Sequence, residues 1–227
     1  MRILLSCLMV MLMLAGCSEK EEAGNKEPSV DVNDNQSENE GVDHAGLTGL
    51  PASINLESYS TFSNLMLDDF ILVTNRVYDR VYEEMAAGKD IPRVMIGNYE
   101  TMGEMFTIQI MEGLDFTGML NEDDTVNMVT LVKKHFPEDV TDKDELERKK
   151  AINDQYEILK RTLIGATAPK ASAEDIKAIE DGLDMTEEQK IEEPTFAYKG
   201  ITYTEATDIS DAENPQVYFF ITPESGE

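Results

Sequence analysis

Residues 62–85 read FSNLMLDDFILVTNRVYDRVYEEM, and this stretch dominates the fold that we expect for the chain. Its apolar residues recur every three or four positions, which is typical of one face of an α-helix. The main row consists of Phe62, Met66, Phe70, Val73, Val77, Val81 and Met85. A second apolar row lies beside it, so the helix presents a broad surface to its neighbours. We therefore predict a central helix over residues 58–87, which Gly88 ends.

The segments that follow are also interpreted as helices. Four of them show helical spacing or end charges: residues 95–110 after Pro92, 123–136, 141–165, and a short helix after Ser172. Residues 123–136 begin with two aspartates and end with two lysines, as the helix dipole favours. In 141–165, acidic and basic residues stand four apart, for example Asp144 and Arg148. Ser172 and Asp175 have the spacing of a capping box.

Beyond Pro194 the apolar pattern changes to a period of two. Residues 196–198 and 201–204 flank Lys199-Gly200 and predict a hairpin with a two-residue turn, and 217–222 supply a third strand. The predicted fold class is therefore mostly α, of the α+β type. We expect a helical domain of about five helices with a small C-terminal antiparallel hairpin or three-stranded sheet.

Composition restricts the classes of function. The 227 residues include 46 acidic and 19 basic side chains, a net charge of −27, which argues against binding to nucleic acid or to an anionic membrane surface. Hydrophobic residues make up 41 % and charged residues 29 %, as in a globular chain. The two cysteines, Cys7 and Cys17, both lie near the N-terminus and exclude a disulfide framework.

The N-terminus reads MRILLSCLMVMLMLAGC, residues 1–17. A positive start, an apolar run too short to span a membrane and small residues before a cysteine are typical of a secretory signal. The last four residues, Leu14-Ala15-Gly16-Cys17, resemble the lipobox of bacterial lipoproteins. This resemblance implies that the peptide is cut before Cys17 and that the Cys17 thiol is diacylated. Two acyl chains would contribute on the order of 20 kcal/mol to membrane attachment.

The chain therefore divides into three parts. Residues 1–16 are the predicted signal peptide, and residues 17–46 are the acylated cysteine followed by an acidic tether with few apolar residues. Residues 47–227 are the predicted acidic domain. We expect the protein to be lipid-anchored to the cell membrane or the outer membrane, on the extracytoplasmic side.

Two patterns in the sequence partly resemble metal-binding sites. Met102 and Met105 have the M-x-x-M spacing of soft thioether ligands for Cu(I), but methionine also fills helical cores, which is the interpretation that we favour. Asp31, Asn33 and Asn35 match the start of an EF-hand-like calcium loop, whose Gly and final Glu are missing. We therefore predict no cofactor and no metal.

Signatures of enzymes are missing from the sequence: it has no nucleophile elbow, zinc-protease, S-x-x-K or P-loop motif. His135 is the sole histidine of the domain and lies beside two lysines, so we interpret it as a surface residue. Paired carboxylates could hydrolyse a glycoside, but so many acids single out no pair. We therefore predict that the protein is not an enzyme.

Aromatic residues of the C-terminal strands suggest a surface for a partner. If one face of the strands packs on the helices, Tyr198, Tyr203 and Tyr218 are candidates to contact an envelope protein. The leading hypothesis is a non-catalytic binding or accessory lipoprotein of the cell envelope. The alternatives are a lipoprotein that handles a small ligand or a metal, copper or calcium, and then a carboxylate-based hydrolase.

Overall fold

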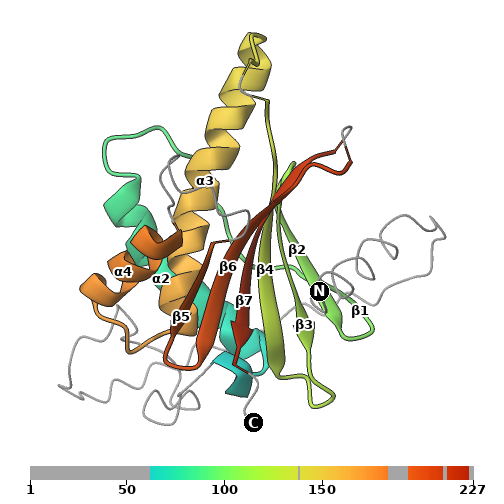
Figure 1. Cartoon of the computed structure of the whole chain (residues 1–227), viewed down its shortest axis with the longest axis vertical. Coiled ribbons are helices and arrows are strands. Elements are labelled where there is room, and N and C mark those ends of the chain that lie inside the picture. The colour runs from blue at the N-terminus through green and yellow to red at the C-terminus, as the bar shows by residue number, and fades with distance from the viewer. Residues whose placement is uncertain (1–61, 138, 184–193, 212–213, 225–227) are drawn as a thin grey trace, which may run out of the picture. The chain divides into compact units, whose positions relative to one another are not determined.

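A computed structural model describes residues 62–137, 139–183, 194–211 and 214–224. In this part of the chain a seven-stranded antiparallel sheet has the order β1-β2-β3-β4-β7-β6-β5 (Figure 1). Its strands are β1 Glu100–Met102, β2 Met105–Met111, β3 Leu114–Leu120, β4 Val126–Lys134, β5 Thr195–Tyr198, β6 Ile201–Asp208 and β7 Gln216–Pro223. Two meanders, β1–β4 and β5–β7, are thus joined by the pairing of β4 with β7.

Helices cover one face of this sheet, which we call the inner face (Figure 1). They are the short 3₁₀ helix η1 Phe62–Asn64 and the α-helices α2 Leu67–Met85, α3 Lys143–Thr167 and α4 Ala173–Leu183. Helix α2 packs on α3, α3 contacts β4, and α4 contacts β5 and β6. The chain thus crosses from β4 to β5 through the helical layer, and a single core forms between the two layers.

The core follows the alternation of the strands. In β3, residues Leu114, Phe116, Gly118 and Leu120 are buried, while the residues between them are partly exposed. The C-terminal half of α3 is buried on almost every side, as expected for a helix enclosed between a sheet and two other helices. At Gly118 a side chain would not fit, because a Cβ atom would lie 2.3 Å from the Met128 carbonyl oxygen. Strands β3 and β4 and the Phe106 ring therefore approach closely at this point.

The expected fold class, mostly α with about five helices and a small C-terminal sheet, is wrong. The described residues form three α-helices and seven strands. The helix predicted over 95–110 is replaced by β1 and β2, and the helix predicted over 123–136 by β4. The C-terminal strands do not form a separate sheet, because β7 pairs with β4 along six residues of each strand.

The physical reason for the first error is that residues four apart lie on the same side of both a helix and a strand. Phe106 and Ile110 satisfy both patterns, but Ile108 between them is also buried, which only a period of two explains. In the second error, Asp123 does not begin a helix. Its carboxylate accepts hydrogen bonds from the Thr125 backbone N–H (3.2 Å) and hydroxyl (2.6 Å), and thereby closes the turn before β4.

Other elements agree with the sequence. The predicted helix over 58–87 is confirmed only for α2, Leu67–Met85. Residues 62–64 form η1 instead, Met66 forms a β-bridge with Thr125, and residues 58–61 lie outside the described part. At the start of α4, the Asp175 N–H donates to the Ser172 hydroxyl and the Ser172 N–H donates to the Asp175 carboxylate, so the capping box is confirmed. The hairpin is confirmed as well: Tyr198 pairs with Ile201 across a turn in which Lys199 and Gly200 both have positive φ.

Candidate functional site

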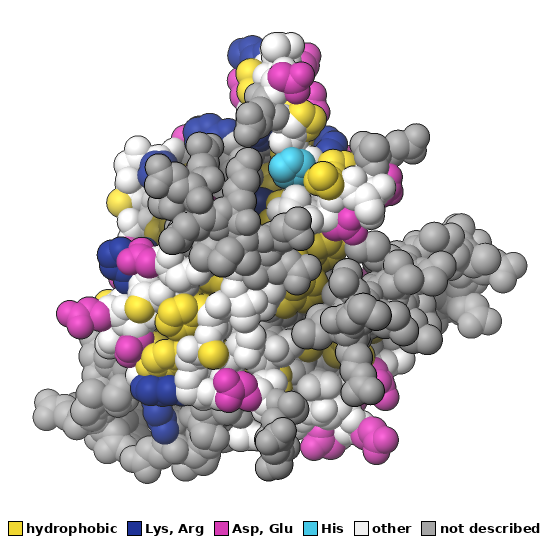
Figure 2. All heavy atoms as spheres, in the orientation of Figure 1, with side chains coloured by type: hydrophobic (Ala, Val, Ile, Leu, Met, Phe, Trp, Pro, Cys, Tyr) yellow, Lys and Arg dark blue, Asp and Glu magenta, His cyan; other side chains and the backbone are white. Residues whose placement is uncertain are grey.

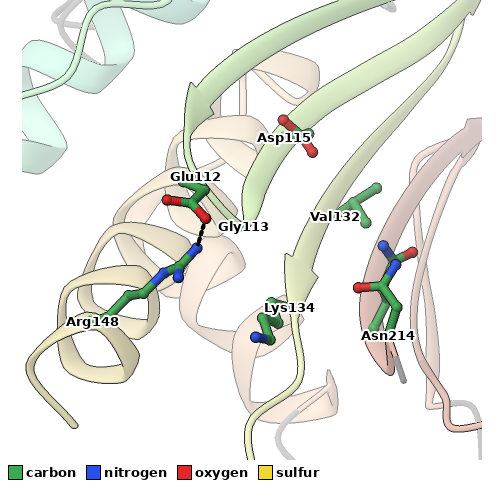
Figure 3. Close-up of a pocket in the computed structure, with 8 residues that line it drawn as sticks. Glu112, Gly113, Asp115, Val132, Lys134, Arg148 and Asn214 are labelled. Carbon is green, nitrogen blue, oxygen red and sulfur yellow. Dashed lines mark ion pairs between the residues drawn. The ribbon is translucent and has the colours of Figure 1, made fainter. Parts of the chain in front are cut away.

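A cavity of about 340 Å³ lies at the end of the sheet where β3 begins and β4 ends (Figure 3). We call it the polar pocket. Its walls come from the β2–β3 turn, β3, β4, α3 and the segment that enters β7, and they consist of Glu112, Gly113, Asp115, Val132, Lys134, Arg148, Asn214 and Gln216. Segments far apart in the sequence therefore supply both charges and two side-chain amides to one cavity.

An ion pair forms one wall of the polar pocket. Arg148 extends from α3 and contacts the Glu112 carboxylate in the β2–β3 turn, with Asn214 on the opposite side of the pocket (Figure 3). The sequence had suggested Asp144, four residues away on the same helix, as the partner of Arg148. The long-range contact forms instead, because the turn after β2 brings Glu112 beside the exposed first half of α3.

Two further charges line the polar pocket without an ion pair to any described residue. Asp115 is partly buried on β3, and this burial raises the pKa of its carboxyl group. Lys134, at the end of β4, holds its Nζ 5.2 Å from the centre of the Phe136 ring. No hydrogen bond or ion pair joins Asp115 to Lys134 or to other described side chains. The pocket therefore holds opposite charges that leave hydrogen-bonding capacity for a ligand.

A second group of charges lies between α3 and the inner face. The Lys160 Nζ atom is 2.5 Å from a Glu205 carboxylate oxygen, and the Lys160 side chain is only 4 % exposed. Lys133 on β4 donates to Asn153 (3.2 Å) and lies 4.0 Å from the centre of the Tyr156 ring. Burial lowers the pKa of Lys133, although nearby carboxylates oppose this shift. These charges are enclosed by the two layers, so we assign them a structural role.

The three candidate tyrosines for a partner surface do not lie together. Tyr203 is fully buried, with its hydroxyl 3.1 Å from the Thr167 hydroxyl, and burial raises the pKa of Tyr203. Tyr198 is partly buried against the core. Tyr218 lies on the outer face and stacks on Phe220, with ring centres 5.6 Å apart and planes 5° apart. Only Tyr218 therefore belongs to a face that the described helices leave uncovered.

The two candidate copper ligands do come together. Met102 and Met105 lie directly opposite each other in the β1–β2 pair. The structure adds two methionines that the sequence analysis missed: Met119 lies opposite Met105, and Met128 lies opposite Met119. None of the four belongs to the buried core of the described residues. The positions of Met119 and Met128 in the sequence gave no signal, because only the register of the strands places them in one row with Met102 and Met105.

Several predictions fall outside the part of the chain that the structure describes. These are the lipobox (Leu14, Ala15, Gly16, Cys17), the tether, and the calcium-like loop at 31–35. Of the predicted residues that the structure does describe, His135 follows β4 and is partly exposed. The described residues contain no group of three or more His, Cys, Asp or Glu side chains that could hold a metal ion. No described helix is long and apolar enough to cross a membrane.

Comparison with known proteins adds no relative: no family model, curated protein or solved structure matches the chain. The candidate site therefore depends on the geometry of these residues alone.

Proposed function

We propose that the chain is a lipid-anchored lipoprotein of the cell envelope whose domain is a non-catalytic binding module, with the polar pocket as its ligand site. One observation carries the binding role: Asp115 and Lys134 face one cavity from neighbouring strands, and neither is paired with a described side chain. Groups of opposite charge held apart suit a compact polar ligand that carries both a negative and a positive group.

The size and lining of the polar pocket support this proposal. Its volume of about 340 Å³ lies in the lower part of the range of about 300–1,000 Å³ that small-molecule sites occupy. Lys134 and the Arg148 guanidinium would attract a carboxylate or phosphate, while Asp115 would accept hydrogen bonds from an amine. The amides of Asn214 and Gln216 can donate and accept on the far wall.

The same geometry favours binding over catalysis. Hydrolysis by two carboxylates needs an acid and a base or nucleophile facing one bond. Here the Glu112 carboxylate is held by Arg148, and its side chain is 82 % exposed, so it is not enclosed with Asp115. Among the described residues that line the pocket, this leaves Asp115 as the only partly buried carboxyl group. We therefore keep the hydrolase only as a remote alternative.

Membrane anchoring is tested with Cys17→Ala in the full chain. The variant cannot accept the diacylglycerol, so it should leave the membrane fraction or remain unprocessed. Fractionation followed by mass spectrometry of the N-terminus measures both results. A variant that matures normally and stays with the membrane would contradict the lipid anchor.

Ligand binding is tested on the full chain in detergent by calorimetry. The probes are individual L-amino acids and dipeptides, with the corresponding amines and carboxylic acids as single-charge controls. We expect at least one zwitterion to bind more tightly than its single-charge analogues, and Asp115→Asn and Lys134→Gln to weaken it. Lys89→Gln, on an exposed turn after α2, is the matched control. Absence of binding, or equal binding by all variants, would contradict the assignment of the pocket.

A further inference from the structure

Four methionines form a row across the first meander of the sheet, and we call it the methionine row. The register of the strands places Met102 opposite Met105, Met105 opposite Met119, and Met119 opposite Met128. Residues directly opposite each other in antiparallel strands direct their side chains to the same face, with Cβ atoms about 4.5–5.5 Å apart. Four thioethers therefore lie side by side on four consecutive strands.

The methionine row lies on the outer face. The neighbours of Met119 along β3, Gly118 and Leu120, are both buried, and so are Phe106 next to Met105 and Val129 next to Met128. Side chains alternate along a strand, so the methionines point away from the helices. Met102 is 65 % exposed and the other three are partly exposed. Core packing, which the sequence favoured for these methionines, therefore does not explain the row.

The charges near the methionine row suit a cation. Glu104 lies in the turn between Met102 and Met105, Glu100 lies on β1, and both side chains are exposed. In the view of Figure 2, the Asp and Glu side chains that can be seen lie mainly along the edges of the face shown. Exposed carboxylates such as those of Glu100 and Glu104 raise the local concentration of cations, while the thioethers themselves remain neutral.

We propose that the methionine row binds a soft monovalent cation, Cu(I), through two or three adjacent thioethers. Thioether sulfur is a soft ligand that selects Cu(I) over hard cations such as magnesium and calcium. With Cβ atoms about 5 Å apart, the flexible side chains of Met102, Met105 and Met119 can converge on one ion above the middle strand. This metal site is independent of the polar pocket, which lies at the other end of β3.

The test uses the full chain in detergent with Cys7→Ser and Cys17→Ser, which removes every thiol that could bind Cu(I). Competition between the protein and a chromogenic chelator for Cu(I), under anaerobic conditions, measures the affinity. In a separate NMR experiment Ag(I) is added in place of Cu(I), and the methyl resonances of ¹³C-labelled methionine are followed. We expect one tight site whose binding shifts the resonances of the methionine row. Because thioethers take up no proton, the affinity should be the same at pH 5 and pH 7.

Variants then separate a metal site from an apolar surface. Met105→Leu and Met119→Leu keep the apolar character of the row but remove a metal ligand. Each should weaken Cu(I) binding by at least about tenfold, because even the loss of a residue that only orients a metal ligand typically costs about tenfold or more in metal affinity. Met95→Leu is the matched control, because Met95 is 82 % exposed and lies outside the row. Unchanged affinity in the row variants, an equal loss in Met95→Leu, or strong dependence on pH would overturn the proposal.

Discussion

The inner and outer faces of the sheet carry different kinds of side chain, although both are built from residues that alternate along the same strands. The inner face carries the large buried side chains, such as Phe106, Phe116 and Phe219, and a lysine–glutamate pair enclosed under α3. The outer face carries threonines, stacked aromatic rings, the methionine row and one wall of the polar pocket. The difference indicates that stability depends mainly on the inner face, whereas both binding sites that we propose lie at the outer one.

The largest effect is expected on the inner face. Phe116→Ala removes a fully buried ring that packs edge-on against Phe106, with ring centres 5.6 Å apart. The free energy of unfolding should fall by about 3–5 kcal/mol, because the core cannot collapse around the cavity. Urea unfolding of the full chain measures this loss. The neighbouring outer-face variant Thr117→Ala is the control, and an equal loss there would show that the two faces do not differ.

The buried ion pair should give the next largest effect. Glu205→Leu leaves the Lys160 ammonium enclosed without this carboxylate, which should lower the free energy of unfolding by about 2–3 kcal/mol. This loss is smaller than is usual for a broken buried ion pair, because the Glu205 side chain is 23 % exposed. In the double variant Lys160→Met/Glu205→Leu, most of the loss should be recovered, since neither charge of the pair remains buried. Urea unfolding compares the two. If the double variant is the less stable, the pair itself stabilises the fold.

A smaller effect is expected for the stacked rings of the outer face. Tyr218→Ala removes the stacking on Phe220 and should lower the free energy of unfolding by about 1 kcal/mol. Thermal unfolding followed by circular dichroism detects this change. A loss as large as that of Phe116→Ala would mean that the outer face is also a core, covered by another part of the chain or by a partner.

The smallest effect concerns the charge of Asp115. Its folded pKa is raised, so between pH 3.8 and that folded pKa the folded state holds a proton that the unfolded state has lost. Stability therefore falls as the pH rises through this window, and the loss persists at neutral pH. Asp115→Asn should therefore be slightly more stable than the parent protein at pH 7, and the two should be equally stable well below pH 3.8. Melting curves from pH 3 to 7 test this, and a destabilised variant would indicate a carboxylate partner.

Local patterns predicted the three α-helices that form and the last hairpin, but they also predicted two helices that the structure replaces with strands. Helix α2 follows from apolar residues three and four apart, α4 from the capping box of Ser172 and Asp175, and the β5–β6 turn from Lys199-Gly200. Each of these signals acts within a few residues of its own position. These elements could be predicted from the sequence because hydrogen bonds inside one turn do not depend on the rest of the fold.

The first meander was not predicted, although some signals were present. Between Thr125 and Val132 five of eight residues are β-branched, which favours a strand. The acidic start and basic end of this segment are also typical of a helix, and the prediction gave this charge pattern more weight than the β-branched residues. The polar pocket, and the methionine row beyond Met102 and Met105, could not be predicted, because Glu112 meets Arg148, and Met105 meets Met119, only after the strands are in register.

The sequence by itself determined the acidity of the chain, the lipobox-like N-terminus, the three helices and the C-terminal strands, since these depend on composition and on neighbours within a few positions. Only the tertiary structure decided that β7 joins β4 to make one seven-stranded sheet. That pairing and the register of β1–β4 bring together residues that are distant in the sequence. Long-range hydrogen bonds between strands select one register from many, and every site proposed for the domain depends on that selection.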